Sequence, residues 1–241
     1  MRVLVTRPEP DASDEVEALA SRGHEGVKAP LLIIEPVKNV ALELDTAQAL
    51  IVTSRNALRA LATHSDLDRA RKLRLFAVGA ATARAARELA FADVTEGPGN
   101  GAGLAELIKT ETRSADGPLV HLAGDTLAFD LKSPLEAQGF SVRQPVLYRS
   151  LQATQLPPQA LSLLGDGRVD GVMLMSPRTA KTFADLLARH GLVTQGKRLV
   201  CYCLSKAVAE VLSPLGFSVR VASQPREEDV LALVSAEGAS S

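Results

Sequence analysis

Short aliphatic runs alternate along the chain with Ala- and Leu-rich stretches of helical period. The first three segments set the rhythm, with a strand-like run at 3–6, a helix-like stretch at 11–21 and a second strand-like run at 27–33. This alternation predicts βαβ units, in which each helix crosses back over a sheet. The pattern predicts further strands at 49–53, 75–78, near 94, 119–122, 142–148, 171–175, 199–204 and 218–221, and further helices at 56–63, 81–89, 104–110, 127–138, 179–190, 206–212 and 227–234.

Ten predicted strands with helices between them favour an α/β fold with parallel sheets covered on both faces. A single ten-stranded sheet is uncommon, and internal similarity favours two smaller ones. Pro30 and Pro145 occupy matching surroundings, as do Ser54 and Ser176. We therefore expect two similar doubly wound parallel-sheet domains of about five strands each.

The segments that follow the two matching prolines are candidate linkers, LLIIEPV after Pro30 and VLYRSLQ after Pro145. If the chain leaves the first domain there and later returns, that domain is discontinuous and combines 1–34 with 152–241. The second domain then spans 40–144, and 35–39 and 145–151 connect the two. A simple cut at mid-chain also gives each half five strands, so the strand count leaves the connection open.

Charge and composition narrow the possible partners. The 241 residues are 46% hydrophobic, which is typical of a soluble globular protein. Lys and Arg number 27 against 28 Asp and Glu, so the chain lacks the excess positive charge of nucleic-acid binding proteins. The chain opens directly into a strand-like run and holds no apolar run of membrane-spanning length. We expect a cytoplasmic protein with no nucleic-acid or membrane partner.

The cysteines and histidines do not form a recognisable metal or redox pattern. Cys201 and Cys203 lie two apart in one predicted strand, so both point to the same face, where we expect them in the core. The four histidines are scattered, and a zinc site needs more ligands at suitable spacing. We expect no metal.

The predicted strands end in hydroxyl-bearing, small and basic residues. Ligands of open parallel sheets bind beyond the carboxyl ends of the strands, where helix N-termini present free N–H groups, so this edge favours anions. Arginines there can add bidentate bonds to a carboxylate. The candidate ligand-binding residues at these corners are Thr6, Arg7, Ser54, Arg55, Asn56, Gly79, Gly124, Asp125, Ser176, Pro177, Arg178 and Ser205.

Several of these residues could instead have a purely structural role. Ser54 and Ser176 are each well placed to be helix N-caps, and Arg55 and Arg178 could be solvated. The segment EGPGNGAG precedes a helix, but it lacks both the dinucleotide-binding spacing and a P-loop lysine, which favours a flexible loop. Tyr148 could act as a weak general acid with its ordinary pKa near 10, or it could be a half-buried strand tyrosine.

Six motifs in order, VLVTRP, VTSRNAL, AVGAATA, PVLYRS, LMSPRTAKTF and CLSKAVAEVLSPLGF, resemble the uroporphyrinogen-III synthase family over nearly the full length. The resemblance implies two α/β domains joined by a two-stranded connector, with the first domain discontinuous. It also implies a monomeric enzyme of tetrapyrrole biosynthesis without a cofactor. The substrate would be hydroxymethylbilane, handed over from hydroxymethylbilane synthase and cyclised with loss of water and inversion of ring D.

The same resemblance assigns roles to individual residues. Tyr148 matches the tyrosine suspected of protonating the leaving hydroxyl, and Thr82 matches a threonine that lines the interdomain cleft. Many members repeat the Gly-x-x-Thr-Ala pattern in the second copy, whereas this chain has CLSKA, which places Lys206 at the threonine position beside Ser205. Lys206 could pair with a substrate carboxylate or point to water.

Two other functions are compatible with the same pattern. A non-catalytic protein with two α/β domains could close over a small anionic ligand, although an exported receptor would be expected to carry a signal segment. A nucleotide-binding enzyme would need a phosphate loop, which the chain lacks.

Overall fold

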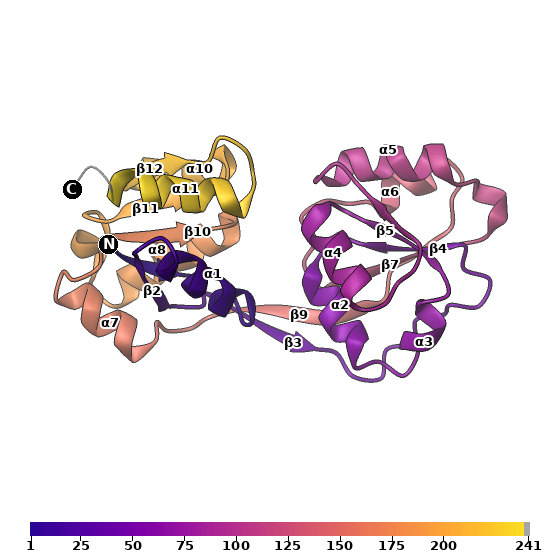
Figure 1. The fold of residues 1–241 in the computed structure, drawn as a ribbon, viewed down its shortest axis with the longest axis horizontal. Helices are drawn as coiled ribbons and strands as arrows, with labels where there is room; N and C mark the ends of the chain where they lie inside the picture. The colour runs from indigo at the N-terminus through magenta and orange to yellow at the C-terminus, as the bar shows by residue number, and fades with distance from the viewer. Residues whose placement is uncertain (239–241) are drawn as a thin grey trace. The chain divides into compact units, whose positions relative to one another are not determined.

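The chain folds into two compact units in a computed structural model that describes residues 1–238. The first unit contains Met1–Ile33 and the chain from Leu151 onward, and the second contains Ile34–Ser150. The chain passes between the units in β3 (Leu32–Pro36) and returns in β9 (Val146–Gln152), as Figure 1 shows. These two strands pair with each other.

The backbone bonds at the ends of this pair show that the two connector strands are antiparallel. The N–H of Val37 donates to the carbonyl of Leu147 at 2.8 Å, and the N–H of Ala153 donates to the carbonyl of Leu31 at 3.0 Å. Residue numbers therefore increase along β3 as those of the paired residues in β9 decrease, which is the antiparallel arrangement.

The sheet of the first unit has five parallel strands in the order β12-β11-β10-β1-β2. Successive side chains point to opposite faces, so Leu4 packs under one helix layer while Val3 and Val5 pack under the other. Helices α7, α8 and α10 cover the Leu4 face, and α1 and α11 cover the opposite face. The strands are β1 (Arg2–Val5), β2 (Glu25–Lys28), β10 (Gly171–Leu174), β11 (Val200–Cys203) and β12 (Ser218–Val221), and the helices are α1 (Asp11–Ala20), α7 (Pro158–Gly165), α8 (Pro177–Arg189), α9 (Val193–Gly196), α10 (Lys206–Leu212) and α11 (Glu227–Gly238), with a 3-10 turn at Ser213–Leu215.

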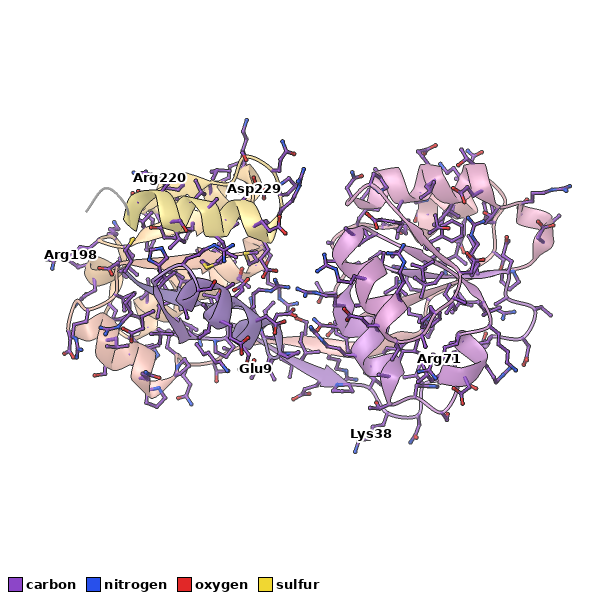
Figure 2. The ribbon with its side chains drawn as sticks, in the orientation of Figure 1. Glu9, Lys38, Arg71, Arg198, Arg220 and Asp229 are labelled. Atoms are coloured by element: carbon purple, nitrogen blue, oxygen red, sulfur yellow. The ribbon has the colours of Figure 1, made fainter. Side chains whose placement is uncertain are left out.

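Polar side chains fasten α11 to the sheet of the first unit. Arg220 of β12, labelled in Figure 2, forms an ion pair with Glu237 of α11 at 3.0 Å. The hydroxyl of Tyr202 in β11 donates to the other oxygen of the same carboxylate at 2.7 Å. At the start of the helix, Ser223 donates to Asp229 at 2.6 Å. Each end of α11 therefore has its own polar contact in addition to the apolar core.

The sheet of the second unit follows the order β3-β9-β7-β4-β5-β6, with β8 paired to β7. Leu50 and Val52 of β4 pack against α2, α3 and α4, while Ala49 and Ile51 pack against α5 and α6 on the opposite face. The strands are β4 (Ala49–Val52), β5 (Arg74–Ala77), β6 (Val94–Glu96), β7 (Leu119–Gly124) and β8 (Val142–Arg143), and the helices are α2 (Arg55–Ala62), α3 (Leu67–Ala70), α4 (Ala80–Glu88), α5 (Gly101–Glu111) and α6 (Lys132–Glu136), with a 3-10 turn at Ser114–Asp116.

The predicted fold class is confirmed, with parallel sheets covered on both faces in each unit. Three predicted elements are wrong in extent. The run at 27–33 forms two strands, β2 and β3, with Pro30 between them, and 142–148 forms β8 and part of β9 around Pro145. Proline has no N–H to donate to a ladder, so each run breaks there. The helix predicted at 127–138 is reduced to Lys132–Glu136.

In the part of the chain that the structure describes, no helix is both long enough and apolar enough to cross a membrane.

Candidate functional site

The carboxyl ends of β4, β5 and β7 lie at one edge of the second unit, because these strands are parallel neighbours. Ser54 follows β4, Gly79 follows β5, and Gly124 ends β7. Ser54 and Gly79 are the N-caps of α2 and α4, both in extended backbone conformation. This edge therefore combines helix N-termini with short side chains, the arrangement that anions favour.

Ser54 connects the start of α2 to Tyr148. Its oxygen accepts the N–H of Asn56 at 3.1 Å, which confirms that it is an N-cap. Its hydroxyl is also hydrogen-bonded to the phenol of Tyr148 and lowers the pKa of that group. Because the serine oxygen already accepts a backbone proton, its own proton is free to reach the phenol oxygen. The phenol proton then remains available to a ligand.

Tyr148 is a buried tyrosine at the junction of β9 with the second unit, with 8% of its surface exposed. Burial raises the pKa of the phenol above its ordinary value, and this effect exceeds the opposing hydrogen bond from Ser54; the negative charge of Asp125 raises it further. The group is thus a neutral O–H donor throughout the physiological range. Gly124 packs directly under the ring, where a Cβ would come within 2.5 Å of the tyrosine Cζ.

The Gly-rich segment after β6 is tied to the end of β5. The N–H of Gly97 donates to the carbonyl of Ala77 at 2.8 Å, and the N–H of Gly99 donates to Val78 at 2.7 Å. A Cβ on Gly79 would lie 3.0 Å from the Cα of Gly99, so the two backbones approach closely. Thr82 lies in the first turn of α4 and is 6% exposed.

At the first unit's edge, Ser176 and Thr179 form a capping box at the start of α8, with Pro177 as its first residue. Ser176 is therefore also a helix N-cap, which confirms the structural role that the sequence allowed for it. Ser205 precedes α10 in extended conformation and, within the described residues, makes no side-chain capping bond. The Thr6 hydroxyl is buried and donates to the carbonyl of Met173 at 2.6 Å, so it serves the sheet.

The remaining predicted binding residues differ in accessibility. Lys206, at the start of α10, is exposed. Arg55 and Arg178 are half-buried at the starts of α2 and α8, and each makes an interaction within the protein. The Asn56 side chain accepts a hydrogen bond from Arg59 at 2.8 Å. Ser54, Asn56, Gly79, Thr82, Gly124 and Asp125 share the second unit with Tyr148, whereas Thr6, Arg7, Ser176, Pro177, Arg178, Ser205 and Lys206 lie in the first.

Arg7 lies among three carboxylates that the sequence interpretation missed. One terminal nitrogen contacts Asp11 at 2.8 Å, and the other contacts Glu15 at 3.4 Å and also Glu227 of α11. Burial raises the pKa of Glu15 to about 7, against the opposing effect of the Arg7 charge. A substrate carboxylate at Arg7 would have to compete with these partners.

Glu15 could have been recognised from the sequence. It falls on the buried stripe of α1 between Ala12 and Leu19, at the spacing of a core-facing helix surface. A carboxylate on such a stripe requires a cationic partner or a proton. One of its oxygens is buried and, within residues 1–238, has no hydrogen-bond partner.

His121 is a buried histidine in β7 that no prediction singled out. One ring nitrogen lies 3.2 Å from the hydroxyl of Thr53, and burial lowers the pKa of the imidazole to about 4. The ring is therefore neutral at physiological pH and serves the core beneath the β4 corner. Both cysteines are buried in the core of the first unit, as predicted.

Two parallel sheets, each with helix N-termini and hydroxyls at its carboxyl edge, define a two-unit α/β protein suited to an acidic ligand. The family model described as Uroporphyrinogen-III synthase HemD matches residues 13–232. The chain belongs to the uroporphyrinogen-III synthase family, an enzyme family of haem biosynthesis, and the resemblance predicted from its motifs is confirmed.

Solved structures share the fold. The uroporphyrinogen-III synthetase from Helicobacter pylori is 18% identical, with a TM-score of 0.66 over 98% of this chain and 100% of that one. A mutant uroporphyrinogen III synthase from Thermus thermophilus is 17% identical, with a TM-score of 0.55 over 99% of this chain and 98% of that one. A comparison with curated proteins gives no significant match.

Proposed function

We propose that this protein is a uroporphyrinogen-III synthase that converts hydroxymethylbilane to uroporphyrinogen III with loss of water and inversion of ring D. The family match over 13–232 supports the reaction class. The observation that carries the mechanism is the neutral, buried phenol of Tyr148, which is hydrogen-bonded to Ser54 beside the N-terminus of α2. In this role the protein is a carbon-oxygen lyase of the hydro-lyase type.

The first step is departure of the terminal hydroxyl of the bilane. Tyr148 donates its proton to that oxygen, water leaves, and the electron pair of the nitrogen in ring A, the terminal pyrrole that bears the hydroxymethyl group, forms the azafulvene cation. The Ser54 hydroxyl stabilises the phenolate through its hydrogen bond. Because the pyrrole supplies the electrons, the step requires no cofactor.

The second stage inverts ring D. The substituted carbon of ring D attacks the cation to give a spiro-pyrrolenine, which fragments and closes to the macrocycle. When the last ring carbon loses its proton and regains aromaticity, a proton is released and the phenol is restored. The protein must hold the flexible chain in the spiro geometry and exclude water from the cation, since direct closure would give the uninverted ring.

The acetate and propionate groups of the substrate require anion-binding groups. The helix N-termini after Ser54 and Gly79 in the second unit, and after Ser176 and Ser205 in the first, offer backbone N–H donors. Lys206 is exposed at the start of α10, so its ammonium group is accessible both to water and to a substrate carboxylate, and we propose the second role. Thr82, Arg55 and Arg178 complete the proposed set, whereas the hydroxyl of Thr6 serves the sheet.

The test is to incubate the purified protein with hydroxymethylbilane, oxidise the products and separate the isomers. A synthase gives the type III isomer in excess. A non-catalytic binding protein leaves the spontaneous type I product, and that result contradicts the proposal. We further propose a cytoplasmic monomer that receives hydroxymethylbilane from its synthase; sedimentation of the purified chain at working concentration tests the oligomeric state.

A further inference from the structure

Leu147 and Tyr148 are consecutive residues of β9, yet both side chains lie in the same core cluster, under α2 and α4. Successive residues of a regular strand point to opposite faces of the sheet. Both residues are buried, with 2% and 8% of their surfaces exposed. The backbone of β9 must therefore be irregular at this point.

The irregularity is a shift in the pairing of β9 with β7. Ala123 pairs with Val146, but the next residue, Gly124, pairs with Tyr148. One step along β7 thus corresponds to two steps along β9, and Leu147 is the extra residue. A β-bulge of this kind re-aims the side chains that follow it, and such bulges are frequent beside active sites.

The absence of a side chain at Gly124 leaves room for the ring of Tyr148. A Cβ at this position would lie 2.5 Å from Cζ of Tyr148, 2.7 Å from Cε2 and 2.8 Å from the phenol oxygen. Contacts this short are not tolerated, so any side chain at 124 would displace the ring from Ser54. The close approach explains why β7 ends in glycine.

Asp125 fixes the backbone of β9 on both sides of Arg149. Its N–H donates to the carbonyl of Tyr148 at 3.0 Å, and one carboxylate oxygen accepts the N–H of Ser150 at 3.0 Å. These bonds hold the strand immediately after the bulge. The side chain of Asp125 thereby supplies an acceptor for the backbone N–H of Ser150 just beyond the end of β7.

We propose that Gly124 and Asp125 are positioning residues for the reaction, and that together with the bulge at Leu147 they aim the phenol of Tyr148 at Ser54. The inference rests on the proposed function, because Tyr148 is the proton donor of that reaction. It also assigns Gly124 and Asp125 a role other than direct substrate binding.

The first test is Gly124→Ala. Displacing a catalytic group by about 1 Å can cost about 10²-fold in rate, so kcat should fall by about that factor with little change in KM. The matched control is Gly165→Ala, since a Cβ at Gly165 meets nothing within 4 Å. The chain has two tyrosines, so ¹³C-labelled tyrosine gives two Cζ resonances, which Tyr148→Phe assigns. The Tyr148 resonance should shift in Gly124→Ala and stay in place in Gly165→Ala.

The second test is a pair of variants at Asp125, which also covers the case that Gly124→Ala does not fold. Asp125→Ala removes the acceptor for Ser150 and should lower kcat and shift the Tyr148 resonance. Asp125→Asn retains an oxygen at that position and should recover most of the loss, which separates the backbone bond from the negative charge. In a Tyr148→Phe background, Asp125→Ala should cost no further turnover, because both act through one hydroxyl.

Folded Gly124→Ala and Asp125→Ala variants with wild-type kcat and an unmoved Tyr148 resonance would overturn the positioning role. A wild-type protein that makes no type III isomer would instead contradict the proposed function. In that case the Tyr148 resonance still decides whether Gly124 and Asp125 place the ring.

Discussion

Ser54 is hydrogen-bonded to Tyr148 across two strands that are far apart in the sequence, while its oxygen caps α2 through the N–H of Asn56. One hydroxyl therefore serves both the helix and the phenol. Ser176 caps α8 in the first unit through its bond with Thr179. Both serines cap a helix, but only Ser54 is also hydrogen-bonded to Tyr148, so a comparison of the two separates the effect of the cap from that of the tyrosine contact.

We predict that Ser54→Ala and Ser176→Ala both destabilise the protein by about 1 kcal/mol, the usual cost of a lost N-cap. Ser54→Ala alone should raise the pKa of Tyr148, because the hydrogen bond from Ser54 lowers it. It should also reduce turnover about tenfold, the equivalent of one hydrogen bond. Urea unfolding and ¹³C titration of the tyrosines measure these effects. A Tyr148 pKa that moves equally in both variants would show that the contact has no specific role.

Tyr148→Phe should lower kcat by about 10²-fold, the lower range for loss of a general acid, with little change in affinity because only the proton donor is removed. The control is Tyr202→Phe, in which the lost hydroxyl binds Glu237 in the first unit. That variant should lose stability but retain wild-type kcat. The measurement is the initial rate of type III isomer formation at saturating substrate. Unchanged turnover in Tyr148→Phe would reduce this tyrosine to a packing role.

The corners of the sheets were predictable because strand ends, prolines and hydroxyls leave local signals. Ser54 and Ser176 follow their strands where hydrophobic runs stop, and both begin helices as predicted. The bulge at Leu147 was not predictable, because it depends on the pairing of β9 with β7, which are separated along the chain. Local patterns report which residues end a strand, but they do not report the register between strands.

The surroundings of Arg7 show the same limit. Its place at the end of β1 is expected from the sequence, and Asp11 lies one helical turn away. Glu227 is separated from Arg7 by most of the chain and meets it only because α1 and α11 cover the same face of the sheet. The spacing of residues along the chain does not indicate partners that only the topology brings together. The sequence therefore predicts that Arg7 binds the substrate and does not predict its ion pair with Glu227.

Glu15 should make stability depend on pH. Its pKa is about 7 in the folded protein, raised by burial above the ordinary 4.5, so the folded state favours the protonated carboxyl. Its contribution to stability is therefore complete below pH 4.5 and is lost as pH rises to about 7. Arg7, Asp11 and Glu227 are the charged groups that face it.

The measurement is urea unfolding of wild type and Glu15→Gln between pH 4 and pH 8. Each unit of difference between the folded and unfolded pKa of Glu15 changes the free energy of unfolding by roughly 1.4 kcal/mol. The glutamine side chain of the variant cannot ionise, so Glu15→Gln should be more stable relative to wild type at pH 8 than at pH 4, by up to about 3 kcal/mol. Parallel curves for the two proteins across this range would contradict a raised pKa at Glu15.

Arg7 is predicted to bind a substrate carboxylate, but it also neutralises a buried acidic cluster, and the two roles must be separated. Reversing its charge should weaken substrate binding and also unfold the first unit. Arg7→Gln alone should cost about 3–5 kcal/mol of stability, because it leaves buried carboxylates without their partner. Adding Glu15→Gln removes the most buried of these carboxylates and should restore part of that loss.

Substrate affinity is then measured on the Arg7→Gln/Glu15→Gln double variant, with Glu15→Gln as its control, by titration with a stable linear tetrapyrrole analogue. A direct contact between Arg7 and a substrate carboxylate predicts a Kd about tenfold weaker in the double variant than in the control, which corresponds to about 1.4 kcal/mol. Equal affinities would mean that the guanidinium serves only Asp11, Glu15 and Glu227. The anion-binding capacity of that edge would then belong to the backbone N–H groups at the N-termini of α8 and α10.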